Sequence, residues 1–298
     1  MLKALESAMK VLVTGAAGRL GSAVVAHLLE AGYEVKATDY KHREGLPVRL
    51  VHADLRDEIA VYTLLEGCDA VAHFGNHANL LAGPSPQRLL AENTAMNANV
   101  FRAAVDIGIR RIVFASSVQA ILKVPNGMRA EAPYTIPYLP LDGGVPSNPG
   151  SNLYALSKEF GERLLQELSL EHPDLVATTL RFPVLIGEAW LERFTGGGKP
   201  APRSSFNFGE LLGYLMFSDA AALVRATLDK QLPGYHQYYP AQTLEVRGVS
   251  VADLIREFYP GVPLRRPIEQ IEALVDLSGI AEALGWAPKH RAVVEFAG

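Results

Sequence analysis

Cysteine and long apolar runs are scarce in this sequence. Cys68 is the single cysteine among 298 residues, which excludes an internal disulfide and any metal site built from several thiolates. No run approaches the roughly 18 consecutive apolar residues that span a bilayer, and the initial MLKALESAMK has too short an apolar run for a signal peptide. We therefore expect a protein of a reducing compartment, the cytoplasm, without a membrane segment or a metal site.

A strong charge of either sign is also missing. The formal net charge is −4, from 28 basic and 32 acidic residues, so the chain has no general field to hold the phosphates of nucleic acid or of a membrane surface. Hydrophobic residues make up 49% of the chain, far more than a disordered chain contains. The composition predicts one or two folded domains, at roughly 150 residues per domain, that bind neither nucleic acid nor membrane.

Short apolar runs alternate with helical patterns in the first part of the chain. The strand-like KVLVTG begins at Lys10, a helical pattern follows over 20–31, and the alternation continues to RRIVFASS, which ends at Ser117. Such alternation is typical of a parallel sheet covered by helices on both faces. We therefore predict an α/β fold with a doubly wound parallel sheet, preceded by an extension over residues 1–8.

Three glycines, Gly15, Gly18 and Gly21, follow the first predicted strand in the sequence TGAAGRLG. Glycines at this place allow a tight turn, a close approach of the backbone to a pyrophosphate, and close packing of helix on strand. The free amide groups at the start of the helix then face the anion. Because a strand precedes this turn and a helix follows it, the sequence predicts a dinucleotide site.

Asp39 ends the second predicted strand, 18 residues beyond Gly21. A carboxylate there can accept hydrogen bonds from the hydroxyl groups of an adenosine ribose, and it repels the 2′-phosphate of NADP. NAD is therefore the predicted cofactor. NADP stays an alternative because Lys41 and Arg43 follow closely and could hold that phosphate.

Two polar residues, Tyr154 and Lys158, lie one turn apart in a helical pattern further along the chain. They therefore project from the same side of the predicted helix, off its apolar stripe. A tyrosine hydroxyl has a pKa of about 10 and is a poor base at neutral pH, but a nearby ammonium stabilises the phenolate and lowers that pKa. The pair predicts a tyrosine that exchanges a proton with a substrate beside the cofactor.

Taken together, these features resemble the extended branch of the short-chain dehydrogenase/reductase superfamily, that is, the NAD-dependent epimerases, dehydratases and reductases. The resemblance rests on the GxxGxxG spacing, Asp39, FASS, the YxxxK pair, HFGN, NTAMNAN, RFPVLIG and LGWAP, and it spans about residues 10 to 290. It implies a Rossmann-type NAD-binding domain over 1–182, joined by a returning segment near 214–230. The remainder, 183–298, would be mainly a smaller substrate-binding domain.

The resemblance also implies roles for individual residues. Ser117 would hold the substrate oxygen, with Ser116 as the fallback, Tyr154 would transfer the proton, and Lys158 would also hold the nicotinamide ribose. The implied cofactor contacts are Gly15, Ala17, Gly18, Arg19, Leu20, Gly21, Asp39, Asp54, Leu55, Phe74, Gly75, Asn93, Ala115, Ser116, Tyr154, Lys158, Phe182 and Pro183. The candidate substrate contacts are Asn76, Ser117, Val118 and Arg181.

The substrate half departs from one pattern of the family. Many members that bind nucleotide sugars carry an arginine just before the segment matching YLMFSDAA, where it holds a diphosphate, but Leu212 and Gly213 stand there in this chain. A diphosphate needs charge-assisted contacts, so a nucleotide sugar is disfavoured unless another cation replaces that arginine. The candidates are Arg193, Lys199, Arg203, Arg247, Arg265 and Arg266.

A free sugar acid would need only one arginine, and the chain also resembles the uronate dehydrogenases somewhat. Arg181 is the candidate for this contact, with a structural ion pair as an equal alternative. A segment rich in proline and glycine over 119–152 is expected to line the substrate pocket, with Tyr134, Tyr138 and Asp142 as possible contacts.

The predicted activity is hydride transfer between nicotinamide C4 and a carbinol or carbonyl carbon of a sugar, sugar acid or related polyol. A nucleotide-sugar epimerase or dehydratase that retains its NAD is the alternative within the same fold, and a non-catalytic, NAD-sensing regulatory protein is a remote one. The resemblance further implies a homodimer formed through the helices near 90–107 and 152–170.

Overall fold

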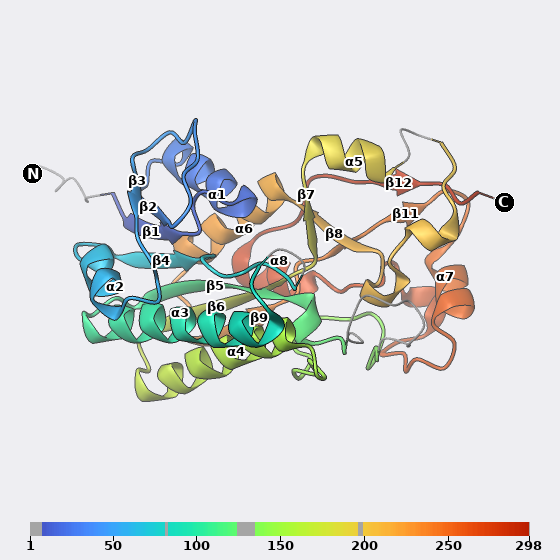
Figure 1. Cartoon of the computed structure of the whole chain (residues 1–298). Coiled ribbons are helices and arrows are strands. Elements are labelled where there is room, and N and C mark those ends of the chain that lie inside the picture. Colours follow the sequence, from blue (N-terminus) through green and yellow to red (C-terminus); the bar gives the residue numbers. More distant parts are fainter. Residues whose placement is uncertain (1–7, 81–82, 124–134, 196–198, 298) are drawn as a thin grey trace, which may run out of the picture.

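A seven-stranded sheet forms the centre of the larger part of the molecule (Figure 1). The structure, a computed structural model, describes residues 8–80, 83–123, 135–195 and 199–297, so most of the expected extension over 1–8 lies outside it. The strand order is β3-β2-β1-β4-β5-β6-β9, and every neighbouring pair is parallel. The strands are β1 (Lys10–Thr14), β2 (Glu34–Asp39), β3 (Leu50–His52), β4 (Ala70–His73), β5 (Arg111–Ser117), β6 (Val176–Phe182) and β9 (Gly234–Tyr238).

Helices cover both faces of this sheet. Successive side chains of a strand point to opposite faces, so Val11 and Val13 of β1 pack into one apolar cluster and Leu12 into another. The first cluster includes α1 (Arg19–Glu30), α6 (Phe217–Asp229) and α8 (Ser278–Leu284). The second includes α2 (Glu58–Leu65), α3 (Pro86–Asp106) and α4 (Leu153–Glu171), of which α3 and α4 lie side by side. The predicted doubly wound parallel sheet is confirmed.

The smaller part of the molecule is less regular. Its three-stranded sheet has the order β10-β8-β7, and β11 pairs with β12. The strands are β7 (Val184–Ile186), β8 (Gly213–Met216), β10 (Gln242–Thr243), β11 (Glu245–Val246) and β12 (Val293–Val294), and the helices are α5 (Glu188–Phe194) and α7 (Val251–Phe258). Two further apolar clusters form its core. The short elements leave long connections, which carry several side chains of the site.

The chain returns to the large sheet after β8. Helix α6 packs against α1 and buries Leu223 and Val224 there, and β9 then pairs with β6 as the edge strand. The observed return begins at Phe217 and ends at Tyr238. Helix α6 lies within the expected segment near 214–230, residues 214–216 belong to β8 of the smaller sheet, and β9 follows the segment. No helix in the described part of the chain is long and apolar enough to cross a membrane.

Candidate active site

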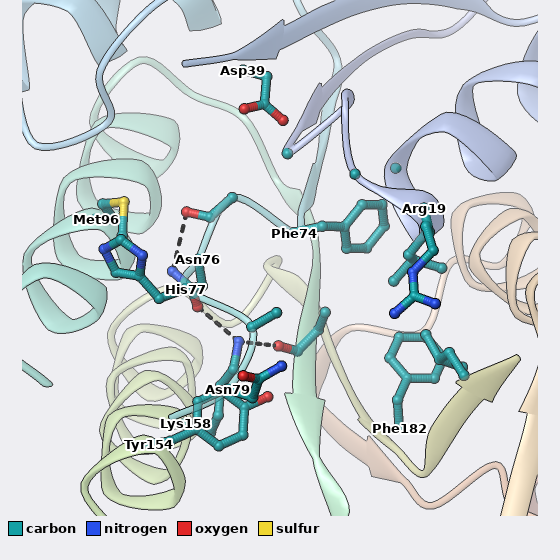
Figure 2. A pocket seen from close by; sticks show the side chains of 18 of the residues that line it. Arg19, Asp39, Phe74, Asn76, His77, Asn79, Met96, Tyr154, Lys158 and Phe182 are labelled. Atoms are coloured by element: carbon teal, nitrogen blue, oxygen red, sulfur yellow. Dashed lines mark hydrogen bonds between the residues drawn. The ribbon is translucent and has the colours of Figure 1, made fainter. Parts of the chain in front are cut away.

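The main cavity lies at the carboxyl ends of β1, β4 and β5. From β1 the sheet continues through β2 and β3 in one direction and through β4 and β5 in the other, and ligands of such sheets bind where the strand order reverses. The cavity has a volume of about 980 Å³. Figure 2 shows Asp39 at one end of it and Tyr154 and Lys158 at the other.

The glycine turn leaves no room for side chains. Gly15 has a φ of +66°, and a Cβ atom there would lie 2.7 Å from the carbonyl carbon of Phe74. A Cβ atom on Gly21 would lie 2.1 Å from the carbonyl oxygen of Gly15. Gly18 precedes α1 and provides no side-chain cap, so the first amide groups of the helix are available to an anion. This backbone fits the pyrophosphate of a dinucleotide.

Asp39 is held in place at the end of β2. One carboxylate oxygen accepts a hydrogen bond from the amide of Ala17 at 3.0 Å, and the other accepts one from the amide of Lys41 at 2.9 Å. Arg43 lies beside it and donates to the carbonyl oxygen of Ala17 at 3.0 Å. Asp39, Lys41 and Arg43 all line the cavity, so the structure brings together the carboxylate that favours NAD and the cations that could favour NADP.

A network of charged residues adjoins this end of the cavity. Arg56 donates to Asp54 and Glu92, which holds the pKa of Asp54 below its usual range. Glu92 also accepts from Arg88 at 2.7 Å and bonds to Nε2 of His77 at 2.6 Å. Sequence reasoning found Asp54 but missed the other four residues, because no local pattern relates α2, α3 and the segment after β4.

His73 is buried below the glycine turn. Its ring bonds to the hydroxyl group of Thr14 at 2.7 Å and to the side-chain oxygen of Asn97 at 3.0 Å. Burial lowers the pKa of His73 to about 3, so the ring is neutral at physiological pH. Thr14 also accepts hydrogen bonds from the amides of Phe74 and Gly75, and His73 therefore helps to fix the backbone along the cavity.

The start of α4 positions Tyr154 and Lys158. Asn152 caps the helix by accepting hydrogen bonds from the amides of Tyr154 and Ala155. Lys158 donates to the side-chain oxygen of Asn76 and to the carbonyl oxygen of Ala115, both at 2.8 Å (Figure 2). Burial lowers the pKa of Lys158 to about 7.

The pKa of Tyr154 corrects the expectation drawn from the sequence. This pKa is raised to about 12, mainly by burial and also by the charge of Glu210, while a hydrogen bond from Ser117 acts in the opposite direction. The ammonium of Lys158 lies 5.7 Å from the centre of the tyrosine ring and is held by Asn76 and Ala115. In this state the loss of water around the phenolate is the largest influence on the pKa of Tyr154.

The two serines at the end of β5 have different partners. Ser117 bonds to Tyr154 and accepts a hydrogen bond from the amide of Gln119 at 3.2 Å. Ser116 donates to Glu162 at 2.5 Å. Ser116 lines the cavity and Ser117 does not, but it is Ser117 that bonds to Tyr154.

Arg181 corrects another expectation. Its side chain is 1% exposed, pairs with Glu162 at 2.7 Å, and donates to the carbonyl oxygens of Gly143 and Val145. It does not line the cavity. The ion pair is therefore the alternative that the structure shows, because β6 places the guanidinium beneath the loop, between that loop and α4.

Most of the other predicted residues line the cavity. They are Gly15, Ala17, Gly18, Arg19, Leu20, Gly21, Asp39, Asp54, Leu55, Phe74, Gly75, Asn76, Ala115, Ser116, Val118, Phe182 and Pro183. Asn93 is instead fully buried and bonds to the backbone of His77 and the hydroxyl group of Ser157. It thus supports the cavity wall from behind.

The suggested loop contacts lie elsewhere. Tyr138 donates to Asp142 at 2.8 Å, and Asp142 pairs with Arg265, and none of the three lines the cavity. Tyr134 lies outside the described residues. The substrate end is instead lined by residues that the sequence did not single out, among them Gln119, Asn207 and Glu210.

A family model matches the sequence over residues 11–202, that of the NAD dependent epimerase/dehydratase family. Two curated relatives act on sugars by name. The chain is 32% identical over 183 residues to the NAD-dependent glucose-6-phosphate dehydrogenase of Haloferax volcanii, a match that covers 57% of the chain and 66% of that protein. It is 32% identical over 156 residues to the uronate dehydrogenase of Pseudomonas putida, covering 51% of the chain and 53% of that protein. The chain thus spans about half to two thirds of the length of these relatives.

The structure is also similar to the UDP-glucose 4-epimerase of Bifidobacterium longum, solved with NAD+ and UDP. The TM-score is 0.68 with 20% identity, and the match covers 95% of this chain and 94% of that one, which confirms the fold. With a family model that matches well over half of the sequence, the chain belongs to the NAD-dependent epimerase/dehydratase family, the extended branch of the short-chain dehydrogenase/reductase superfamily.

Proposed function

We propose that this enzyme is an NAD-dependent dehydrogenase that interconverts a carbinol and a carbonyl group of a sugar or related polyol. The observation that carries the proposal is the placement of Tyr154 and Lys158 at one end of a cavity whose other end holds the glycine turn and Asp39. Ser117, just behind the cavity wall, is hydrogen-bonded to Tyr154. Similarity to dehydrogenases named for glucose 6-phosphate and for uronates supports the sugar class.

Ser117, Tyr154 and Lys158 would have different roles in this reaction. Bound NAD would supply the hydride acceptor, and Phe182 and Pro183, which line the cavity, would help to hold it. Ser117 donates a hydrogen bond to the reacting oxygen and stabilises its developing charge. Tyr154, which is protonated at neutral pH in this state, gives its proton to that oxygen in reduction. In oxidation Tyr154 first loses its own proton to water, and the phenolate then takes the proton of the substrate hydroxyl group. Lys158 holds the Asn76 segment and the end of β5 in register with the tyrosine.

NAD is the proposed cofactor rather than NADP. Asp39 is fixed by two backbone amides, so its negative charge cannot swing away from an approaching 2′-phosphate. The guanidinium of Arg43 is already engaged by the carbonyl oxygen of Ala17. The repulsion therefore outweighs the attraction at the ribose.

An epimerase that keeps its NAD is the second candidate, because the family includes such enzymes. A nucleotide sugar would need cations for its diphosphate. Leu212, which stands at the position expected to carry an arginine, is buried in an apolar cluster. A dehydrogenase that releases NADH is therefore the better fit.

We also propose a homodimer and a reducing compartment for this enzyme. Helices α3 and α4 lie side by side on one outer face (Figure 1), where Phe160 and Leu170 are 46% and 72% exposed. This face would form the homodimer. Cys68 is a free, buried thiol, in keeping with a reducing compartment.

The test is NADH formation measured by absorbance across aldoses, polyols, sugar acids and UDP-sugars, with mass analysis of any cofactor that purifies with the protein. We expect the moles of NADH formed to exceed the moles of enzyme with at least one free sugar or polyol. Tightly bound NAD with no net NADH from any substrate, together with conversion of a UDP-sugar to its epimer, would establish the epimerase instead.

A further inference from the structure

A buried carboxyl group at the substrate end of the cavity has no part in the proton transfer described above. Glu210 ends the short 3-10 helix Phe208–Glu210 and lines the cavity, yet only 8% of it is exposed. Burial raises its pKa to about 7, and a hydrogen bond from the side chain of Gln119 opposes the shift. No lysine or arginine of the described part of the chain contributes to that pKa. A buried carboxyl group without a cation is costly, so its presence beside a catalytic tyrosine points to use in the site.

The backbone around Glu210 is tightly fixed. Leu211 and Leu212 follow it with φ values of 60° and 53°, a left-handed conformation that is unfavourable for residues with a side chain. It persists because the two leucines pack into different apolar clusters. The amide of Glu210 also donates to the side chain of Asn207 at 3.2 Å. The turn therefore holds the carboxyl group at one place in the cavity wall.

Glu210 is connected to the catalytic residues through Gln119. The side chain of Gln119 bonds to Glu210 and accepts a hydrogen bond from Asn152 at 3.3 Å, and its backbone amide donates to Ser117 at 3.2 Å. The charge of Glu210 also raises the pKa of Tyr154. A substrate oxygen held by Ser117 and Tyr154 would therefore bring the neighbouring atoms of the substrate close to Glu210.

All the cations that line the cavity except Lys158 lie in its cofactor half, and Lys158 lies beside Tyr154. Those that line it are Arg19, Lys41, Arg43, Arg56, Arg88 and Lys158. Arg19 comes from the glycine turn and lies over the ring of Phe217, and Lys158 is held by Asn76 and Ala115.

The arginines that might have replaced the missing diphosphate ligand lie elsewhere. Arg203 pairs with Glu257, Arg247 with Glu295, Arg265 with Asp142, and Arg266 with Asp276. None of these arginines lines the cavity, and neither does Lys199, while the side chain of Arg193 lies outside the described part of the structure. Among the described side chains, an anionic substrate would therefore meet a carboxylate at the substrate end instead of a guanidinium.

We propose that Glu210, held by Gln119, determines substrate specificity by accepting hydrogen bonds from hydroxyl groups of a neutral aldose or polyol and by repelling carboxylate or phosphate at that position. The inference rests on the proposed function and narrows its substrate class. A hydrogen bond from a hydroxyl group to a carboxylate is charge-assisted and strong, whereas a second anion in the same buried place has no compensating partner.

The test measures binding separately from turnover. A Tyr154→Phe background loaded with NAD is titrated calorimetrically with D-glucose, D-galactose, L-arabinose and xylitol, and with D-glucuronate, D-galacturonate and glucose 6-phosphate. With Glu210 present, we expect the best neutral ligand to bind at least tenfold more tightly than any anionic one. Glu210→Gln keeps the shape and removes the charge, so the ratio should fall to about threefold or less, mainly through tighter binding of the acids. Glu282→Gln, on the exposed face of α8, should leave the ratio unchanged.

The outcomes separate the two proposals. If anions bind as tightly as neutral sugars when Glu210 is present, the specificity role is overturned. The same holds if no ligand binds at all. Neither result requires the Glu210→Gln variant to fold. An unchanged ratio in a folded Glu210→Gln protein also overturns it. Selective binding of neutral sugars without NADH formation by the unmodified enzyme rejects the proposed dehydrogenase and keeps the role of Glu210. NADH formation from sugar acids alone keeps the proposed dehydrogenase and rejects the role of Glu210.

Discussion

At the cofactor end of the cavity the backbone forms the binding surface, whereas at the substrate end side chains from distant segments form it. The first end consists of consecutive residues, Gly15 to Gly21, between one strand and one helix. The second combines Gln119, Tyr154 and Glu210, which come from three separate segments. A surface made of consecutive backbone accepts one shape of ligand, while a surface made of separate side chains can change its chemistry by single substitutions. The difference explains how one fold can keep its cofactor and vary its substrate.

The largest effect should come from removing one hydroxyl group at the substrate end. Tyr154→Phe should lower kcat by about 10²- to 10⁴-fold, the usual contribution of a general acid–base group, because no proton donor then faces the reacting oxygen. NAD binding, followed by fluorescence or calorimetry, should stay within about threefold. Tyr138→Phe is the matched control, since Tyr138 bonds to Asp142 away from the cavity. Retained turnover in Tyr154→Phe would remove the tyrosine from the mechanism.

The buried ion pair between Arg181 and Glu162 should contribute to the free energy of unfolding. Arg181→Met leaves Glu162 buried without its partner, which costs about 3–5 kcal/mol of unfolding free energy. Arg265→Met breaks a partly exposed pair, which costs about 0–1 kcal/mol. Urea unfolding of both variants gives the comparison. If both variants lose a similar amount of unfolding free energy, the buried pair stabilises the protein no more than the partly exposed one.

At the cofactor end, the prediction tests the backbone of the glycine turn. Gly15→Ala places a Cβ atom 2.7 Å from the backbone of Phe74 at a φ of +66°, whereas Gly67→Ala has a φ of +70° and open space. Both variants carry the cost of the left-handed backbone, about 1–2 kcal/mol, but only Gly15→Ala displaces the turn. We expect NAD affinity to fall at least tenfold, about 1.4 kcal/mol, in Gly15→Ala and to stay unchanged in Gly67→Ala. Equal affinities would show that the turn tolerates the displacement.

The smallest effect should distinguish the two dinucleotides. Asp39→Ala removes the charge that opposes a 2′-phosphate and leaves Arg43 nearby, so the ratio of kcat/KM for NAD to that for NADP should fall about tenfold or more. Asp174→Ala, which removes the exposed partner of Arg110, should not change the ratio. An Asp39→Ala enzyme with the original preference would mean that other groups select the cofactor.

The sequence identified the cofactor end well and the substrate end poorly. The turn after β1 and the spacing of Tyr154 and Lys158 are local patterns, so their geometry follows from strand, turn and helix rules alone. The expected helix near 90–107 is α3, Pro86–Asp106, because its capping and apolar spacing are local too. Glu210 has no such pattern, since its place in the cavity depends on a turn held by packing.

The sequence by itself determined the alternation of strands and helices, the glycine turn, and the presence of a tyrosine and a lysine on one side of a helix. Each of these follows from residues within a few positions of one another. Only the tertiary structure decided that Arg181 pairs with Glu162, that burial raises the pKa of Tyr154, and that β9 completes the sheet. Burial and pairing depend on atoms contributed by segments far apart in the chain, and electrostatic energies inside a protein follow from that burial.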